Sequence, residues 1–320
     1  MNKIDKNESA VVIIGSGAGG GTMAYELTKA GIPCVCLEAG SYIKPEDYTS
    51  DEWGAFMQMA WLDARGTSGS WRVNKDFPGL PAWIVKAVGG TTTHWAGATP
   101  RFMDYEFKTR TTYGNVDGAN LLDWPVSLDE MEPYYDKAEK AIGSTHRHGR
   151  PPLPANNNYK VFANGAENVG YKFYATGPYG TNAEPYDGRP GSIQDGFNFQ
   201  GDKNTSKWST AVREIPRALK TGLLDLRPNS HVIQITHDKA GNANSVLYVD
   251  ENGDIQRQKA KVVCVAGNSI ESPRLLLLSA SSMFPDGLAN SSGQVGRNYM
   301  RHMTGSMYAR FDKPVNMYRG

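Results

Sequence analysis

The N-terminal part of the chain has an apolar run of strand length, a glycine-rich turn and then apolar residues at helical spacing. The run occupies residues 10–14, and residues 15–20 fit the pattern Gly-x-Gly-x-x-Gly. Met23, Leu27 and Ala30 recur with the period of a helix, and the glycine and proline that follow are typical of a helix end. This order predicts a strand, a tight turn and a helix.

A second short apolar run, residues 34–37, predicts another buried strand, which ends at Glu38. Strand, glycine turn, helix, strand and acid stand in the order of a dinucleotide-binding βαβ unit. In such a unit Gly15, Gly17 and Gly20 let the backbone approach a pyrophosphate, and the acid accepts hydrogen bonds from the adenosine ribose. The nucleotide could be NAD, NADP or FAD, although a carboxylate disfavours the 2′-phosphate of NADP. The alternative is an ordinary tight turn between a strand and a helix.

The last third of the chain predicts strands again. We interpret the first four of them as a small antiparallel meander with a hairpin turn at Asn252-Gly253. These strands are residues 225–227, 231–236, 245–249 and 255–258. The unbroken apolar run 261–267 is typical of a buried parallel strand that returns the chain to the nucleotide-binding domain. Ser272 and Pro273 fit the N-cap and the first position of a following helix.

The middle of the chain is less regular. Residues 41–86 are irregular and rich in tryptophan, glycine and aspartate, and we interpret them as a wrapping segment. Residues 127–130 form a capping box, which predicts a helix that ends at Gly143. The predicted apolar face of this helix is Met131, Tyr134, Tyr135, Ala138 and Ile142. Residues 144–158 and 177–206 have few aliphatic side chains, which predicts exposed loops of a substrate-side domain.

Candidate chemistry gathers in one loop, residues 88–101, which holds a glycine pair, three consecutive threonines, a histidine and a tryptophan. Glycines let backbone N–H groups approach a ligand closely, and threonine hydroxyls can donate to phosphate or carbonyl oxygens. His94 and Trp95 place an imidazole beside an aromatic wall. The loop therefore suits a flat redox ring.

Composition and charge exclude several classes of partner. The 320 residues carry a formal net charge of +1. This charge favours neither nucleic acid nor an anionic membrane as a partner, and it indicates a small-molecule ligand. The length predicts about two domains. No apolar run reaches the ~20 residues of a membrane span, and residues 1–9 lack the core of a signal peptide. Cys34, Cys36 and Cys264 lie in predicted strands, so we interpret them as small apolar side chains.

Five separated motifs together carry a family resemblance. They are the glycine turn with its acid, Gly89-Gly90-Thr91, Trp124-Pro125, the segment from Ala266 to Leu275, and Val295-Gly296-Arg297-Asn298. In this order they resemble the glucose-methanol-choline (GMC) oxidoreductases, with the flavoprotein subunits of bacterial sugar and gluconate dehydrogenases as near relatives. The segments 93–95 and 98–102 also resemble pyranose 2-oxidase.

The resemblance implies FAD as the cofactor and hydride transfer from a sugar or polyol hydroxyl to flavin N5. It also implies an α/β fold, with a Rossmann-like FAD-binding domain carrying a three-stranded meander and an incomplete α+β substrate-binding domain. We expect the first domain at residues 1–110 and 207–300, and the second at 111–206 and 301–320. The residues expected to bind the cofactor are Gly15, Gly17, Gly20, Glu38, Gly89, Gly90, Thr91, Thr92, His94, Trp95, Ala96, Gly97, Val232, Ala266, Gly267 and Asn268.

Several histidines carry expectations of their own. His94 occupies the position at which pyranose 2-oxidase attaches its flavin covalently through the 8-methyl group, a bond that needs a neutral imidazole nitrogen. The alternative is a histidine that only lines the flavin pocket. His302 matches a family segment that reaches the flavin, with a structural hydrogen-bonding role as its alternative. His146 and His148 have no carboxylate or thiol neighbours in the sequence, so we interpret them as solvated and not as metal ligands.

The resemblance also concerns electron transfer and partners. Some relatives hold an iron–sulfur cluster through cysteines in the region matching residues 191–208, and the absence of cysteine there excludes thiolate ligation in that region. Family members continue to a catalytic histidine beyond the position of residue 320, so the general base cannot be named. We expect a companion chain that supplies this half, or a fragment, with a catalytically silent flavoprotein as the second functional class. The expected location is the cytoplasm, or the periplasm after export with a partner subunit.

Overall fold

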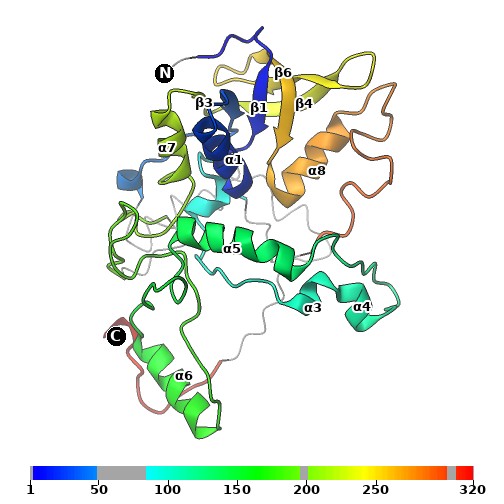
Figure 1. The fold of residues 1–320 in the computed structure, drawn as a ribbon. Helices are drawn as coiled ribbons and strands as arrows, with labels where there is room; N and C mark the ends of the chain where they lie inside the picture. The colour runs from blue at the N-terminus through cyan, green and yellow to red at the C-terminus, as the bar shows by residue number, and fades with distance from the viewer. Residues whose placement is uncertain (1–2, 49–83, 195–200, 301–307, 320) are drawn as a thin grey trace. The chain divides into compact units, whose positions relative to one another are not determined.

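The computed structural model describes residues 3–48, 84–194, 201–300 and 308–319. The chain divides into two compact units (Figure 1), of which the first combines Met1–Ala96 with Asp195–Tyr299 and the second combines Gly97–Gln194 with Met300–Gly320. The domain boundaries expected from the sequence lie after residues 110, 206 and 300. Most of the segment 41–86 and the whole of His302 fall outside the described residues.

The first unit is built on one mixed sheet. Its strands are β1 (Ala10–Ile14), β2 (Cys34–Leu37), β3 (Leu224–Arg227), β4 (His231–His237), β5 (Ala243–Val249) and β6 (Ile255–Val265). The six strands are ordered β3-β2-β1-β6-β5-β4. The pairs β3–β2, β2–β1 and β1–β6 are parallel, whereas β6, β5 and β4 form an antiparallel meander. The predicted α/β fold is confirmed at this level.

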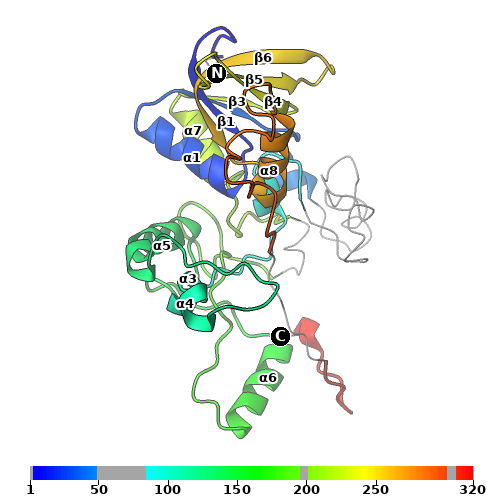
Figure 2. The same cartoon turned by 90° about the vertical axis from the view of Figure 1, so that its right-hand side faces the viewer.

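Helices cover both faces of the parallel part of the sheet. Helices α1 (Ala18–Lys29) and α7 (Glu214–Lys220) lie on one face, and α8 (Asn268–Leu278) lies on the other (Figure 2). Because side chains alternate along a strand, Val11 and Ile13 pack with α1 and α7, whereas Val12 and Ile14 join the cluster that includes Leu275 of α8. A strand that is buried on both faces reads as a continuous apolar run, as predicted here.

Helix α1 contacts the sheet through its smallest residues. Gly20, Gly21, Ala24 and Thr28 are its buried positions. Of the apolar residues at helical spacing, Met23 is 43% exposed, whereas Leu27 packs against the core. Small side chains are buried because the helix approaches the glycine turn too closely for large ones. The helix predicted from the spacing is confirmed.

Two predicted strand assignments need correction. The segment 225–227 does not join the meander, because β3 pairs in parallel with β2 at the edge of the sheet. The predicted strands 255–258 and 261–267 are parts of one strand, β6, which pairs with β5 along its first half and with β1 along its second. The change from alternating to apolar residues therefore marks a change of neighbours, not a break in the chain direction. The turn at Asn252-Gly253 is confirmed, with φ of +85° at Gly253.

Helix α8 begins earlier than predicted. The Asn268 side chain accepts hydrogen bonds from the backbone N–H groups of Ile270 and Glu271, at 2.8 and 3.0 Å. This side chain therefore caps the helix, the role that the sequence assigned to Ser272. Ser272 and Pro273 lie inside the helix.

The second unit contains mainly helices and loops. Its helices are α3 (Asp104–Phe107), α4 (Thr109–Tyr113), α5 (Leu128–Ile142) and α6 (Asn157–Asn168). The short 3₁₀ helices among the described residues of both units are η1 (Pro45–Asp47), η2 (Gly90–Thr93) and η4 (Met317–Arg319). The capping box at Ser127 and Glu130 and the end of α5 at Gly143 are confirmed. The expected apolar face of α5 is wrong, because Tyr134 is 67% exposed and the buried residue of the helix is Glu139.

The loop predicted at residues 144–158 also differs from the structure. Ser144 and Thr145 are buried, and Asn156 caps α6 by accepting a hydrogen bond from the backbone N–H of Tyr159. The sequence did not predict α6, because its apolar positions are sparse and half-exposed. Among the described residues, no helix has both the length and the apolar character needed to cross a bilayer.

Candidate functional site

The glycine turn between β1 and α1 leaves no room for a side chain at Gly15 or at Gly20. A Cβ atom at Gly20 would lie 1.9 Å from the carbonyl oxygen of Gly15, and one at Gly15, where φ is +92°, would lie 2.6 Å from the carbonyl oxygen of Ala266. A Cβ at Gly90 would lie 2.9 Å from the Cα of Gly17. The first turn of α1 carries no acidic residue, so its backbone N–H groups can attract an anion.

Ser16 joins three segments that are distant in the sequence. Its hydroxyl donates to the Glu38 carboxylate at 2.6 Å and accepts from the backbone N–H of Gly89 at 3.0 Å. Its carbonyl accepts from the Thr210 hydroxyl at 2.8 Å. Ser16 is fully buried, so these bonds hold the glycine turn, the end of β2 and the second glycine loop together.

Glu38 lies directly after β2 and is held by the backbone around it. Besides the Ser16 hydroxyl, its carboxylate accepts from the N–H of Ser16 at 2.9 Å and from the N–H of Gly40 at 3.0 Å. Burial raises the pKa of Glu38, and the hydrogen bonds from Ser16 and Gly40 oppose this rise. The sequence predicts a ribose ligand, and the structure adds that the same carboxylate organises the turn.

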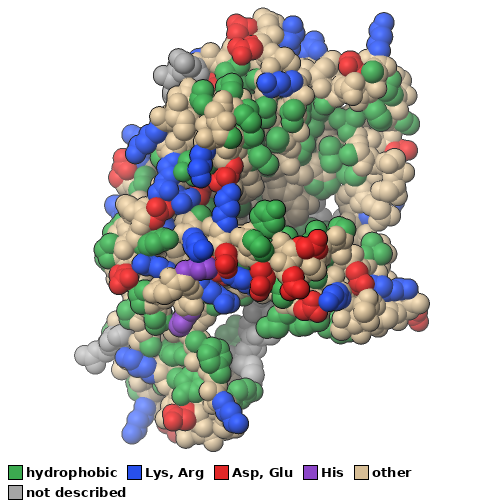
Figure 3. All heavy atoms as spheres, in the orientation of Figure 1, with side chains coloured by type: hydrophobic (Ala, Val, Ile, Leu, Met, Phe, Trp, Pro, Cys, Tyr) green, Lys and Arg blue, Asp and Glu red, His purple; other side chains and the backbone are tan. Residues whose placement is uncertain are grey.

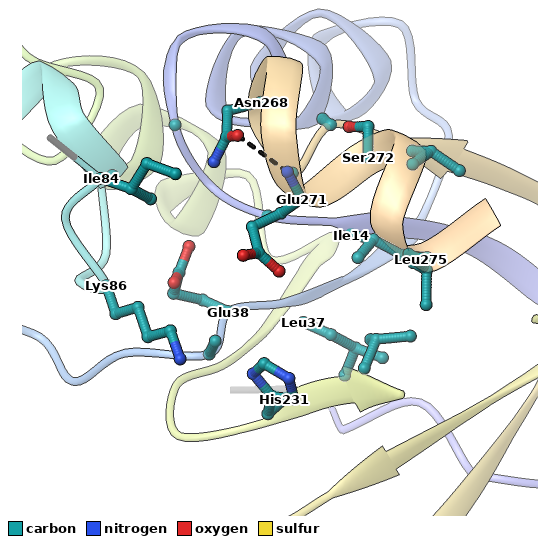
Figure 4. Close-up of a pocket in the computed structure, with 18 of the residues that line it drawn as sticks. Ile14, Leu37, Glu38, Ile84, Lys86, His231, Asn268, Glu271, Ser272 and Leu275 are labelled. Carbon is teal, nitrogen blue, oxygen red and sulfur yellow. Dashed lines mark hydrogen bonds between the residues drawn. The ribbon is translucent and has the colours of Figure 1, made fainter. Parts of the chain in front are cut away.

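A cavity of about 310 Å³ opens beside these residues. Figure 4 shows Glu38, Lys86, His231 and Glu271 around it. Of the residues predicted to bind a cofactor, those that line the cavity are Gly15, Gly17, Glu38, Gly90, Thr91, Thr92, Val232, Ala266, Gly267 and Asn268. They come from the ends of β1, β2 and β6, from η2 and from β4. In open α/β folds, ligands bind at the carboxyl ends of the parallel strands, which is where this cavity lies.

The sequence missed several polar residues of the cavity wall. Lys86, Ser230, His231, Glu271 and Arg274 line it and were not singled out. Burial lowers the pKa of His231, and the neighbouring positive charge of Lys86 acts in the same direction. The proximity of Lys86 to His231 depends on tertiary structure, which explains why no local pattern indicated it.

The other predicted cofactor residues do not line this cavity. Gly20 packs against Gly15, and Gly89 packs against Ala211. His94, Trp95 and Ala96 follow η2 at the end of the first unit's N-terminal segment, and Gly97 belongs to the second unit.

His94 is buried in a polar network. Its Nδ1 lies 2.8 Å from the Thr93 hydroxyl oxygen, and its ring meets the Tyr48 ring edge-on, with 5.8 Å between centroids. Burial lowers the pKa of His94 from 6.5 to about 4, and the positive charge of Lys207 adds to this effect. His94 is therefore neutral near pH 7, as a nucleophilic imidazole requires.

Two hydrogen bonds clamp the segment that follows His94. The ammonium group of Lys207 donates to the carbonyl of Trp95 at 2.7 Å, and the indole N–H of Trp95 donates to the carbonyl of Trp208 at 2.9 Å. Lys207 is 2% exposed, and burial lowers its pKa from 10.5 to about 7, opposed by Asp202. The sequence did not single out Lys207 because 112 positions separate it from Trp95.

The neutral state of His94 predicts a loss of stability in acid. Its pKa is 6.5 when unfolded and about 4 when folded, so the unfolded chain binds the proton first as the pH falls. The stabilisation is present above pH 6.5 and disappears towards pH 4, a change of about 3 kcal/mol in the free energy of unfolding. Urea denaturation at several pH values should detect it, and His94→Gln should remove this part of the acid loss.

His146→Gln is the matched control, because this histidine is exposed. Lys207 also has a lowered pKa, but its contribution changes between pH 10.5 and about 7, above the window of His94. Equal acid losses in wild type and His94→Gln would contradict the neutral buried imidazole.

His148 has acidic neighbours in space that the sequence did not indicate. Its Nε2 lies 2.9 Å from the Glu139 carboxylate, and Asp136 completes a cluster of three possible metal ligands. The Arg101 guanidinium pairs with both acids, so a positive charge already compensates them. Figure 3 shows acidic, basic and histidine side chains side by side on this unit. We interpret the cluster as an ion-pair network that fixes α5.

Comparisons with known proteins connect this site to a family. The family model described as GMC oxidoreductase matches residues 81–304. The chain is 31% identical over 318 residues to the 2-methyl-1,2-propanediol dehydrogenase of Mycolicibacterium austroafricanum, covering 93% of this chain and 55% of that protein. It is 29% identical over 344 residues to the fructose dehydrogenase large subunit of Gluconobacter japonicus, with 95% and 60% covered.

A third relative is the gluconate 2-dehydrogenase flavoprotein of Pantoea cypripedii, which is 28% identical over 370 residues, with 98% of this chain and 58% of that protein covered. The chain thus spans little more than half the length of the curated relatives it matches. The resemblance predicted from the five motifs is confirmed.

Proposed function

Because this chain belongs to the GMC oxidoreductase family, which is FAD-dependent, we propose that its first unit is a Rossmann-like FAD-binding domain of a dehydrogenase. The observation that carries the proposal is the junction at Ser16, where the glycine turn, the acid after β2 and the Gly89 loop meet beside a cavity. We propose the second unit, residues 97–194 with 300–320, as part of the substrate side.

The residues around the cavity suit the adenosine diphosphate part of FAD. The N–H groups at the start of α1 and the glycine turn would bind the pyrophosphate, with Gly267 and Asn268 on its other side. Glu38 would accept a hydrogen bond from the ribose. At Gly15 and Gly20 a Cβ would collide with backbone. Glycine at these positions would let the turn pack closely against a pyrophosphate.

We further propose that His94 bonds covalently to the 8-methyl group of the flavin. His94 would supply the lone pair of a neutral ring nitrogen for the new C–N bond, which would replace one C–H bond of the methyl group. Two protons would be released, one from the methyl group and one from the imidazole, and the dehydrogenase's electron acceptor would take up the two electrons. The burial and lowered pKa of His94 support this role.

The proposed reaction is the two-electron oxidation of a sugar or polyol hydroxyl. The bound flavin would accept the hydride at N5, and a base outside the described residues would accept the hydroxyl proton. Relatives named for fructose, gluconate and 2-methyl-1,2-propanediol support a hydroxylated substrate of this size. We propose that a companion polypeptide or a C-terminal half completes the site.

Anaerobic titration tests the proposal on the protein purified with any chain that accompanies it. Native mass spectrometry should detect FAD and a companion chain. Adding fructose, gluconate or 2-methyl-1,2-propanediol in turn should bleach the flavin absorbance. A flavin that no hydroxylated compound bleaches would favour the silent flavoprotein, and a colourless protein that refuses FAD would overturn both functions.

A further inference from the structure

The Thr93 hydroxyl stands between two polar groups at the start of the His94 segment. Its oxygen lies 2.8 Å from the carbonyl oxygen of Gly90 and 2.8 Å from Nδ1 of His94. The Tyr48 ring lies beside this network, edge-on to the imidazole with 5.8 Å between centroids. Thr93, Tyr48 and His94 are all buried, so water does not compete strongly for these bonds.

One proton decides how this network is arranged. A hydroxyl has one proton and two lone pairs, whereas the Gly90 carbonyl can only accept. Because the Thr93 hydroxyl donates its proton to the Gly90 carbonyl, it can only accept at its contact with His94, from an N–H at Nδ1. If the proton pointed to Nδ1, two oxygen acceptors would face each other at 2.8 Å without a proton between them.

We propose that Thr93 is a positioning residue that fixes His94 as the Nδ1–H tautomer and leaves the lone pair on Nε2. The tautomer assignment depends only on this network. Its use, bonding of Nε2 to the flavin, rests on the proposed function. In a neutral histidine, the hydrogen bond made by one ring nitrogen decides whether the other nitrogen carries a proton. A single hydroxyl is therefore enough to select the tautomer.

The charges around His94 support the same state. The ionisable groups that face it are the Tyr48 phenol and the Lys207 ammonium. Burial raises the pKa of Tyr48 to about 12, so the phenol stays neutral and adds no charge beside the imidazole. Lys207 repels a second positive charge, and an imidazolium would have no lone pair to offer.

Long-range ¹H–¹⁵N NMR spectra of the ¹⁵N-histidine-labelled chain without flavin test the assignment near neutral pH. His94→Gln identifies the signal, because the chain has six histidines. We expect a protonated Nδ1 and an unprotonated Nε2 in wild type and in Thr93→Ser. Thr93→Val removes the acceptor, and the ratio of the two tautomers should shift about tenfold towards Nε2–H.

Thr92→Val is the matched control. Its hydroxyl lies in the same turn and donates to the Gly89 carbonyl, and among the hydrogen bonds of the described residues it has none to the imidazole. An Nε2–H tautomer in wild type overturns the proposal, and so does a Thr93→Val spectrum identical to that of wild type. If Thr93→Val does not fold, the spectra of wild type and Thr93→Ser still decide.

Flavin content separates this proposal from the function. Acid-precipitated wild type should stay yellow, and Thr93→Val should keep about tenfold less acid-stable flavin than Thr93→Ser. Colourless wild-type pellets with Nδ1–H in the spectra would contradict the covalent bond alone. Yellow pellets of equal intensity in all variants would contradict the positioning role of Thr93.

Discussion

Replacing Gly20 with alanine should lower the free energy of unfolding by about 3 kcal/mol and abolish FAD binding. The new Cβ would lie 1.9 Å from the carbonyl oxygen of Gly15 and 3.2 Å from the Ala266 side chain. The obstacle is backbone, so no side-chain rotation can relieve it. Either α1 moves away from the sheet or the glycine turn opens, and both movements displace the N–H groups proposed to bind the pyrophosphate.

Gly19→Ala is the matched control for this change. Gly19 belongs to the same motif and the same helix, but a Cβ there would lie 3.9 Å from the Ala266 side chain, an ordinary contact. Alanine favours helix over glycine by about 0.5–1 kcal/mol, so this variant should be as stable as wild type or slightly more stable. Urea denaturation measures both variants. A Gly20→Ala protein as stable as Gly19→Ala would mean that α1 does not pack as described.

The parts of the fold that the sequence predicts well are those in which neighbours in sequence are neighbours in space. β1, the glycine turn, α1, β2 and Glu38 follow one another without interruption, and each carries its own local signal. The capping box at Ser127 is equally local. In these places residue type and spacing are sufficient, because the partner of each group lies within a few positions.

The remainder depends on contacts across long sequence separations. The Gly89 N–H reaches the Ser16 hydroxyl over 73 positions, and the Lys207 ammonium reaches the Trp95 carbonyl over 112. Strand pairing has the same character, since the residues of β3 suit a meander edge as well as a parallel edge. The α5 face was misjudged because the buried partner of Arg101 is a carboxylate, which apolar periodicity does not detect.

Replacing Glu38 with alanine should lower the free energy of unfolding by about 4 kcal/mol, because three buried donors lose their acceptor and each costs about 1–3 kcal/mol. These donors are the N–H and hydroxyl of Ser16 and the N–H of Gly40. FAD affinity should fall about 100-fold as the proposed ribose contact is lost. Glu38→Gln should show a smaller loss, since the amide keeps one acceptor oxygen. Thermal unfolding and flavin fluorescence titration measure the two effects.

Glu271 provides the control that separates a structural carboxylate from a carboxylate that only lines the cavity. It borders the same space, but its carboxylate pairs with Arg274 at 3.0 Å on a partly exposed helix face. Such pairs contribute about 0–1 kcal/mol, so Glu271→Gln should unfold nearly as wild type does. Comparable losses in both variants would show that the charge of the cavity matters and the Ser16 junction does not. A loss of stability that occurs only in the Glu38 variants would mean that this buried acid, at the end of β2, holds the two glycine loops together.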